Sequence, residues 1–310
     1  MILLPRLSGW IALLLCLAWL WGGAAGTARA VDFPGPDPQQ AKAQADDTSL
    51  VLENRVLACR WTLDGGHLRP DRVTDKLSGK TLALGGECFA FLVARSPSPE
   101  AQVVKASELK LAGAPRMVEV KADPQSRRLA DRFAGREIAV AMATPDGKVA
   151  VQWRAVLRDG ANYVRQHVQI RAKAEPVELR DLVLLELSAP GAEVAGSVDG
   201  SPVVAGNFFL AYEHPMSRST VQPADGEGAT VAFRSAKEAG SGSEKKRNFR
   251  GAKGDCGVVR CGYPYSVAVM PEAPVEHTLA IGVVPEGQLR RGFLYYLERE
   301  RTQPYRTFLH

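Results

Sequence analysis

The fold is decided by "NYVRQHVQIRA", Asn162 to Ala172, where polar and apolar side chains alternate. Successive side chains of a β-strand point to opposite faces, so this alternation separates the two faces of a sheet. One face would carry Tyr163, Arg165, His167, Gln169 and Arg171. The other would carry Val164, Gln166, Val168 and Ile170. The stretch predicts a strand with one face packed in a core and the other face wet or lining a groove.

Short segments of similar character extend in both directions from this stretch. They are rich in β-branched and aromatic residues, and Gly, Pro, Asp or Asn bounds nearly all of them. Asp64-Gly65-Gly66 is a hairpin turn signal. The best helical candidate is Glu286 to Arg306, and a strand is the alternative for this segment. These features predict an all-β fold, a large antiparallel β-sandwich with few short helices.

Composition divides the chain into four parts. They are a signal peptide (1–30), a flexible linker (31–47), a β-sandwich domain (48–288) and a C-terminal segment (289–310). The segment 31–47, "VDFPGPDPQQAKAQADD", contains three prolines and few apolar residues, so order is expected to begin near Ser49. Two long Gly/Ser-rich stretches, Pro97 to Lys110 and Ser235 to Asp255, are expected to be loops.

The first thirty residues have the layout of a secretory leader. An apolar run from Trp10 to Trp21 precedes Ala28-Arg29-Ala30, which matches an A-x-A cleavage site before Val31. The alternative is an uncleaved membrane anchor, but this run is shorter than the roughly 20 residues that span a bilayer. The expected location is therefore secreted or periplasmic, without a transmembrane anchor after processing.

Charge argues against a nucleic-acid partner. The chain has 39 Lys and Arg against 34 Asp and Glu, a net charge of +5, and the two signs are interspersed. Only "EKKRNFRGAK", Glu244 to Lys253, is locally basic, and it is expected to be a solvated loop. A nucleic-acid-binding domain would instead concentrate its basic residues on one face.

Four cysteines remain after the leader, and an exported chain meets an oxidising compartment. Four cysteines allow three disulfide pairings. Proximity in sequence favours Cys59–Cys88 and Cys256–Cys261. A zinc site is the rival interpretation, but the spacing of Cys59 and Cys88 does not suit it, so neither a metal nor a cofactor is expected.

Common catalytic motifs are missing from the sequence. There is no G-x-S-x-G, no H-E-x-x-H, no P-loop and no dinucleotide fingerprint. Glycoside hydrolysis requires two carboxyl groups across a sugar, and the candidates in polar and aromatic surroundings are Asp181, Glu186 and Glu213. None lies in a motif typical of a nucleophile.

The stretch "GNFFLAYEHPMS", Gly206 to Ser217, is the best candidate for ligand binding. Its proline ends a strand, so an acid, an imidazole and aromatic rings would converge at the end of a sheet. Such a mixture suits a carbohydrate. The predicted contacts are Asn207, Tyr212, Glu213 and His214, and a secondary aromatic pair is Tyr263 and Tyr265. The alternative is that Phe208 and Phe209 are core and that Glu213-His214-Pro215 is a corner.

Three segments together resemble a known family. They are "LVLENRVLACRWTLDGGHLRPDRVTDKLSGKTLAL" (50–84), "AGNFFLAYEHPMS" (205–217) and "RRGFLYYLERERTQPYRTFLH" (290–310). They resemble the N-terminal β-supersandwich of α-galactosidase-like glycoside hydrolases, a domain of the galactose-mutarotase-like fold. In that family the catalytic aspartates lie on a following barrel. The resemblance implies that 289–310 is a truncated linker helix toward this barrel, which is missing here, so no residue inherits a catalytic role.

The resemblance implies a carbohydrate-binding or accessory domain that is not catalytic alone. Its expected partners are a galactoside-like carbohydrate and a separate chain carrying the catalytic barrel. The resemblance also implies that residues 292–305 are poorly anchored, since the barrel would cover them. One alternative is a stand-alone mutarotase-type epimerase with His167 as acid and Glu213 or Glu186 as base. The other is a structural or adhesion domain of a cell envelope.

Overall fold

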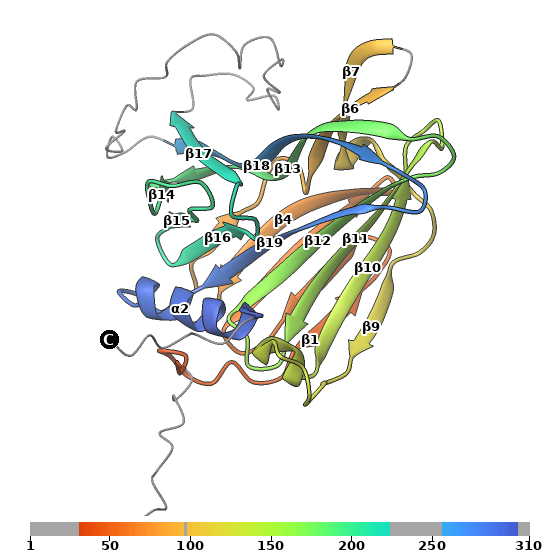
Figure 1. Ribbon diagram of the computed structural model, residues 1–310. Coiled ribbons are helices and arrows are strands. Elements are labelled where there is room, and N and C mark those ends of the chain that lie inside the picture. The colour runs from red at the N-terminus through yellow and green to blue at the C-terminus, as the bar shows by residue number, and fades with distance from the viewer. Residues whose placement is uncertain (1–30, 96–97, 224–255, 303–310) are drawn as a thin grey trace, which may run out of the picture. The chain divides into compact units, whose positions relative to one another are not determined.

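The computed structural model describes residues 31–95, 98–223 and 256–302. The predicted signal peptide and the predicted loop Ser235 to Asp255 lie outside these residues. In the body that begins at Phe33, the described strands pair antiparallel and form three sheets (Figure 1). The predicted all-β antiparallel sandwich is therefore confirmed. No helix in the described ranges combines the length and the apolar character that a membrane crossing needs.

The first sheet has the order β1-β2-β3-β4-β5. Its strands are β1 (Lys42–Ala45), β2 (Ser49–Glu53), β3 (Leu57–Asp64), β4 (His67–Asp75) and β5 (Thr81–Ala83). The predicted hairpin joins β3 to β4, since Asp64 pairs with His67 across Gly65 and Gly66. Both glycines have positive φ, 58° and 81°, which the two-residue turn requires and which only glycine adopts without strain.

The second and largest sheet has the order β14-β15-β16-β19-β12-β11-β10-β8, and β9 also pairs with β10. Its strands are β8 (Lys110–Leu111), β9 (Arg116–Val120), β10 (Gly135–Ala143), β11 (Val149–Arg158), β12 (Tyr163–Ala172), β14 (Glu193–Val194), β15 (Val203–Ala205), β16 (Phe208–Tyr212) and β19 (Val275–Val283). We call it the nine-stranded sheet.

The third sheet has the order β17-β18-β13-β6-β7. Its strands are β6 (Ala90–Arg95), β7 (Ser98–Lys105), β13 (Val177–Pro190), β17 (Arg218–Pro223) and β18 (Cys256–Val269). Two short 3-10 helices complete the connections, η1 (Ala106–Glu108) and η2 (Leu129–Arg132). The predicted loop Pro97 to Lys110 is wrong, because Ser98–Lys105 pairs with β6 as an edge strand.

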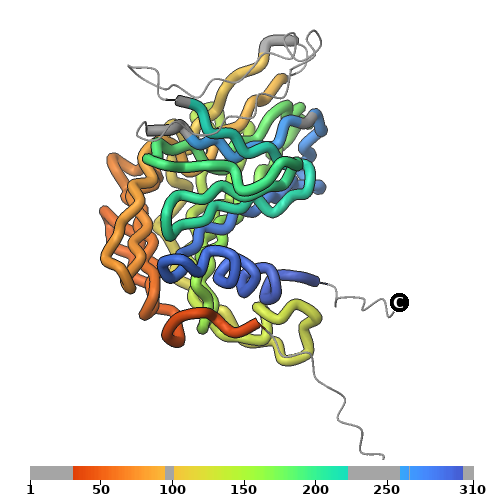
Figure 2. The backbone as a smooth tube through the Cα atoms, turned by 90° about the vertical axis from the view of Figure 1, so that its left-hand side faces the viewer, coloured from red at the N-terminus to blue at the C-terminus, as the bar shows by residue number. Residues whose placement is uncertain are grey.

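The first sheet and the nine-stranded sheet share one core. Trp61 of β3 and Trp153 of β11 meet edge to face, with ring centroids 5.1 Å apart and neither side chain exposed. The Trp61 indole donates a hydrogen bond of 3.1 Å to the buried Gln166 amide of β12. Gln166 therefore faces the core, as the alternation in β12 predicts, and the neighbouring Arg165 and His167 face away. Figure 2 shows the first sheet, in red to orange, along one side of these strands.

The predicted flexible linker 31–47 is shorter than expected. Lys42–Ala45 forms β1, which pairs with β2 from Lys42 opposite Glu53 to Ala45 opposite Leu50. Ala41 is buried, and its backbone N–H donates to the Asp159 carboxylate at 2.8 Å. A polar segment such as "KAQA" has no strand signature of its own, so its pairing with β2 and the neighbouring contact between Ala41 and Asp159 order it.

The C-terminal helix α2 (Leu289–Glu300) confirms the predicted helix and contradicts its predicted poor anchoring. Tyr296 is buried against Tyr163 and Phe209, with ring centroids 4.8 and 5.4 Å away. Arg299 is 2% exposed and donates to the Asp159 carbonyl at 2.8 Å. The nine-stranded sheet therefore holds the helix as far as Glu300, whose carboxylate accepts a hydrogen bond from Tyr163. Residues 303–305 of the segment predicted to be poorly anchored lie outside the described residues.

A glycine allows this close approach. Gly292 lies against Val284, and a Cβ at position 292 would overlap with the Val284 side chain. Glycine inside a helix costs about 0.5–1 kcal/mol relative to alanine. Glycine is required at this position because any side chain there would hold the helix farther from Val284 and the sheet.

Candidate functional site

The face of the nine-stranded sheet that points away from the first sheet carries charged side chains on four neighbouring strands. Arg154 of β11 lies opposite His167 of β12, which lies opposite Thr278 of β19. Glu137 of β10 lies opposite Val156, which lies opposite Arg165. Strand register thus gathers residues that are far apart in sequence into one polar surface.

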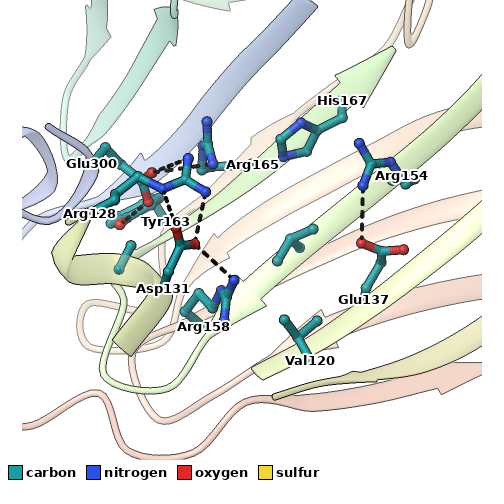
Figure 3. Close-up of a pocket in the computed structure, with 12 residues that line it drawn as sticks. Val120, Arg128, Asp131, Glu137, Arg154, Arg158, Tyr163, Arg165, His167 and Glu300 are labelled. Carbon is teal, nitrogen blue, oxygen red and sulfur yellow. Dashed lines mark hydrogen bonds and ion pairs between the residues drawn. The ribbon is translucent and has the colours of Figure 1, made fainter. Parts of the chain in front are cut away.

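A cavity of about 220 Å³ opens on this polar surface (Figure 3). The strands form its floor, and η2 and the end of α2 contribute to its wall. The lining residues are Val120, Arg128, Ala130, Asp131, Glu137, Arg154, Val156, Arg158, Tyr163, Arg165, His167 and Glu300.

One side of the cavity is built on Asp131. Arg128 donates Nε and Nη2 to this carboxylate at 2.9 and 2.8 Å, and Arg158 donates Nη2 to it at 3.0 Å. Burial opposes ionisation of Asp131, but the hydrogen bonds and charge of Arg128 outweigh it, so the pKa is lowered. Asp131 therefore stays ionised and fixes the orientation of both guanidinium groups.

The adjoining part of the wall is built on Arg165 (Figure 3). Its Nε donates to Glu213 Oε1 at 2.9 Å, its Nη2 donates to Glu213 Oε2, and the Tyr296 hydroxyl donates to the same carboxylate at 2.9 Å. Burial lowers the pKa of Arg165, but Glu213 more than compensates and raises it overall. The remaining Nη1 of Arg165 lies 3.2 Å from Glu300 Oε2, and the Tyr163 hydroxyl donates to Glu300 Oε1 at 2.6 Å.

His167 lies in the wall between these groups and β19. Its Nδ1 is 3.1 Å from Glu276 Oε1 and 3.1 Å from Thr278 Oγ1, and Arg154 donates to Glu276 at 2.7 Å. The hydrogen bond with His167 is the main cause that lowers the pKa of Glu276 to about 2. Glu276 therefore remains ionised at neutral pH and orients the imidazole ring.

The cavity wall alternates donors and acceptors at fixed positions. Guanidinium groups can only donate hydrogen bonds and ionised carboxylates can only accept them. Each pocket arginine has a carboxylate within ion-pair distance, so the wall carries little uncompensated charge. Such a surface can hold a small polar ligand whose own groups both donate and accept.

Two of the residues predicted to bind carbohydrate are buried. Tyr212 is 3% exposed and its ring meets His277, while Asn207 is 5% exposed and donates its side-chain amide to Asp75 at 2.9 Å. All five residues of β16 are buried, because neighbouring strands and α2 cover the segment. Neither side chain offers a surface on which a sugar ring could lie, so the core alternative describes this part of the stretch.

Glu213, His214 and Tyr263 are partly buried. Glu213 belongs to the Arg165 ion pair and does not line the cavity. His214 packs on Tyr263 of β18, with ring centroids 4.2 Å apart, and both rings meet His277. Burial and the nearby His214 lower the pKa of His277 to about 4. The side chain of Tyr265 lies outside the described residues.

The predicted disulfides are wrong. Cys59 and Cys88 are buried free thiols, and burial raises the pKa of both. Cys261 is also a free thiol, although it shares β18 with Cys256. Five strand residues span about 16 Å, more than twice the Cα separation that a disulfide bridges. Across the described ranges, no three His, Cys, Asp or Glu side chains gather as metal ligands would.

Sequence reasoning found one wall of this cavity and missed the rest. The alternation in β12 predicted that Arg165 and His167 share a face that is wet or lines a groove, and both residues line the cavity. The similar alternation of "VQWRAVLR" signals Arg154 and Arg158 on the same face. Arg128 and Asp131 lie on a 3-10 turn and its flank, and Glu300 lies on a helix, where no strand period applies.

Comparisons with known proteins return structural similarity alone. No protein-family model matches the sequence, and no curated protein matches it. An α-galactosidase of family 36, AgaB from Geobacillus stearothermophilus, superposes with a TM-score of 0.44 at 9% identity over 79% of this chain. This chain spans 41% of that α-galactosidase.

Two further solved structures are similar over most of this chain. A protein proposed to be an aldose 1-epimerase, from Klebsiella pneumoniae, gives a TM-score of 0.41 at 9% identity, covering 82% of this chain and 84% of its own. YidC from Thermotoga maritima gives 0.34 at 14% identity, covering 84% of this chain and 56% of its own. Similarities at this level do not identify an activity.

Proposed function

We propose that this chain is a carbohydrate-binding β-sandwich domain, and that the sugar binds in the cavity on the polar face of the nine-stranded sheet. The observation that carries the proposal is the alternation of guanidinium donors and carboxylate acceptors around about 220 Å³. A sugar hydroxyl both donates and accepts hydrogen bonds, so it matches such a wall. A phosphate would instead favour arginines without carboxylate partners.

In finer detail, we propose that the domain is secreted and acts as an accessory part of an α-galactosidase-like glycoside hydrolase. The three segments that resemble that family support this assignment. Glycoside cleavage requires a protonated carboxylic acid beside the glycosidic oxygen. Of the carboxylates that line the cavity, Asp131, Glu137 and Glu300 each lie within ion-pair distance of an arginine. This pairing favours binding without cleavage, and bond breaking would fall to a partner barrel.

A second candidate function is anomer interconversion, favoured by His167. This imidazole lines the cavity and is oriented by the ionised Glu276, so it could transfer a proton to or from a sugar oxygen. Glu213 and Glu186 are poorly placed as the base, because Glu213 is bound to Arg165 and Glu186 lies on β13 of the third sheet. Polarimetry of α-galactose with the purified protein would show a rate above buffer if this function is present.

The test of sugar binding is titration calorimetry with galactose and small galactosides. Arg154→Ala removes a cavity donor and should weaken binding about tenfold or more, since a hydrogen bond to a charged group contributes ~1.5–3 kcal/mol. The matched control is Arg136→Ala, which removes an arginine of β10 that pairs with Glu119 and does not line the cavity. Equal affinities in both variants, or no binding by the wild-type chain, would refute the proposal.

A further inference from the structure

The carboxylate of Glu300 already occupies one end of the cavity. Glu300 is the last residue of α2, and its side chain is 8% exposed. The Tyr163 hydroxyl donates to Oε1 at 2.6 Å, and the Nη1 atoms of Arg128 and Arg165 lie 3.4 and 3.2 Å from Oε2 (Figure 3). We call Arg128, Tyr163 and Arg165 the carboxylate cradle.

The cradle is held in place by residues other than Glu300. Arg128 uses Nε and Nη2 on Asp131, and Arg165 uses Nε and Nη2 on Glu213. Each guanidinium group therefore has its Nη1 left to point at a common position. Burial and the charge of Glu300 raise the pKa of Tyr163 well above its usual value, so its hydroxyl remains a donor. The three donors form a preorganised site for one carboxylate.

Glu300 satisfies this site incompletely. Within the described residues, its buried Oε2 forms no hydrogen bond, although two guanidinium groups lie at ion-pair distance. A buried acceptor without a well-aligned donor costs free energy. An acid in the last turn of a helix is also disfavoured by the negative end of the helix dipole. A free carboxylate could adopt the better geometry that the helix backbone denies to Glu300.

We propose that the carboxylate cradle binds the carboxylate of an acidic sugar, a hexuronate, and that Glu300 is a built-in competitor which the ligand displaces. Exchange of one carboxylate for another keeps the charge balance of the pocket unchanged, whereas a neutral group would leave the cradle without its anion. Displacement moves the last turn of α2 off the polar surface. This inference rests on the proposed function, because it names the sugar class for the same cavity.

The test compares three probes on the full chain: galactose, galacturonate and acetate. Glu300→Ala empties the cradle and should bind galacturonate at least tenfold more tightly than the wild-type chain, with a smaller gain for acetate and none for galactose. The matched control is Glu298→Ala, which removes a carboxylate from the same turn that pairs with Arg301 and does not line the cavity. It should leave all three affinities unchanged.

The outcomes separate this inference from the proposed function. Absence of any galacturonate gain in a Glu300→Ala protein that retains a cooperative melt overturns the cradle, whatever galactose does. If the wild-type chain does not bind galactose, the proposed function is refuted. Tighter binding of acetate by Glu300→Ala than by the wild-type chain would still support the cradle. An equal gain for galactose and galacturonate also overturns the inference, since it would mean that only space was created.

A second measurement needs no variant. Hydrogen exchange of the wild-type chain at saturating galacturonate should be faster in the last turn of α2, Leu297 to Glu300, than at saturating galactose. Displacement of Glu300 breaks the contacts that hold this turn to Tyr163 and Arg165. Unchanged or slower exchange in this turn with bound galacturonate would contradict displacement.

Discussion

Two regions of this molecule bring polar and aromatic side chains together: the segment Asn207 to His214 and the cavity on the polar face. In the first the residues are consecutive in sequence, and in the second they come from separate elements. The segment Asn207 to His214 contains its mixture in consecutive residues, yet its strand is buried and its acid is tied to Arg165. The cavity on the polar face collects its residues from β9 to β12, η2 and α2. Consecutive residues of a strand point to opposite faces of the sheet, so a run of polar and aromatic residues within one strand seldom forms a binding site alone.

The largest effect expected from this comparison is on the buried segment. Phe209 is fully buried and packs against Phe293 and Tyr296 of α2. Phe209→Ala should lower the free energy of unfolding by about 3–5 kcal/mol, because it removes a core ring and leaves a cavity. Urea denaturation measures this change. The control is Met216→Ala in the same stretch, at an exposed position, where a loss as large would contradict the assignment of Phe209 to the core.

Glu213 connects the two regions and should show an intermediate effect. Glu213→Ala leaves the guanidinium group of Arg165 and the hydroxyl of Tyr296 without their shared acceptor. For a partly buried pair we expect a loss of about 1–3 kcal/mol in the free energy of unfolding. If Glu213 instead contacts only ligand, calorimetry would show weaker sugar binding while the melting temperature stayed at the wild-type value.

The imidazole pair beside the segment predicts a pH dependence. The pKa of His277 falls from 6.5 to about 4 on folding, so the unfolded chain binds more protons between these values. The free energy of unfolding should therefore decrease as pH falls from about 6.5 to 4, and this contribution is absent above that window. Partial solvent exposure reduces it to about 1–2 kcal/mol.

His277→Gln should flatten this part of the stability curve. Thermal melts at a series of pH values measure it, and subtraction of the variant from the wild-type chain cancels the carboxylates that titrate in the same range. Curves that run parallel from pH 6.5 to 4 would show that His277 is protonated as easily in the folded chain as in the unfolded one.

The smallest effect is expected at His214. Its ring is half-exposed, and its Nδ1 accepts a hydrogen bond of 3.2 Å from the Met216 backbone in a corner of the chain. His214→Ala should change the free energy of unfolding by less than about 1 kcal/mol and leave galactose binding in the cavity unchanged. If His214→Ala weakened galactose binding tenfold, the sugar would bind at the stretch Gly206 to Ser217, as the sequence predicted, and not in the cavity.

The fold was predictable because its signal is local. The alternation in Asn162 to Ala172 and the turn at Gly65-Gly66 depend on neighbouring residues, and both occur as predicted. The strand Lys42–Ala45 was missed, since its order comes from pairing with β2 and from Asp159 far along the chain.

The site was less predictable because its contacts join residues that are far apart in the sequence. Tyr163 and Glu300 are separated by 137 residues, and Arg158 and Asp131 by 27. No periodicity within a strand indicates which acid a given arginine will meet. The free thiols of Cys59 and Cys88 are a similar case, since nearness in sequence does not bring a residue of β3 to bonding distance of one in the connection before β6.

Gly292 acts on the cavity from a distance. Its contact with Val284 admits a single depth and axial setting of α2, and Glu300 follows eight residues later, about 12 Å along the helix axis. A methyl group at position 292 would push α2 away from Val284 and move the Glu300 carboxylate away from Arg128 and Arg165. The placement of a cavity-lining carboxylate thus depends on Gly292, a residue that does not line the cavity.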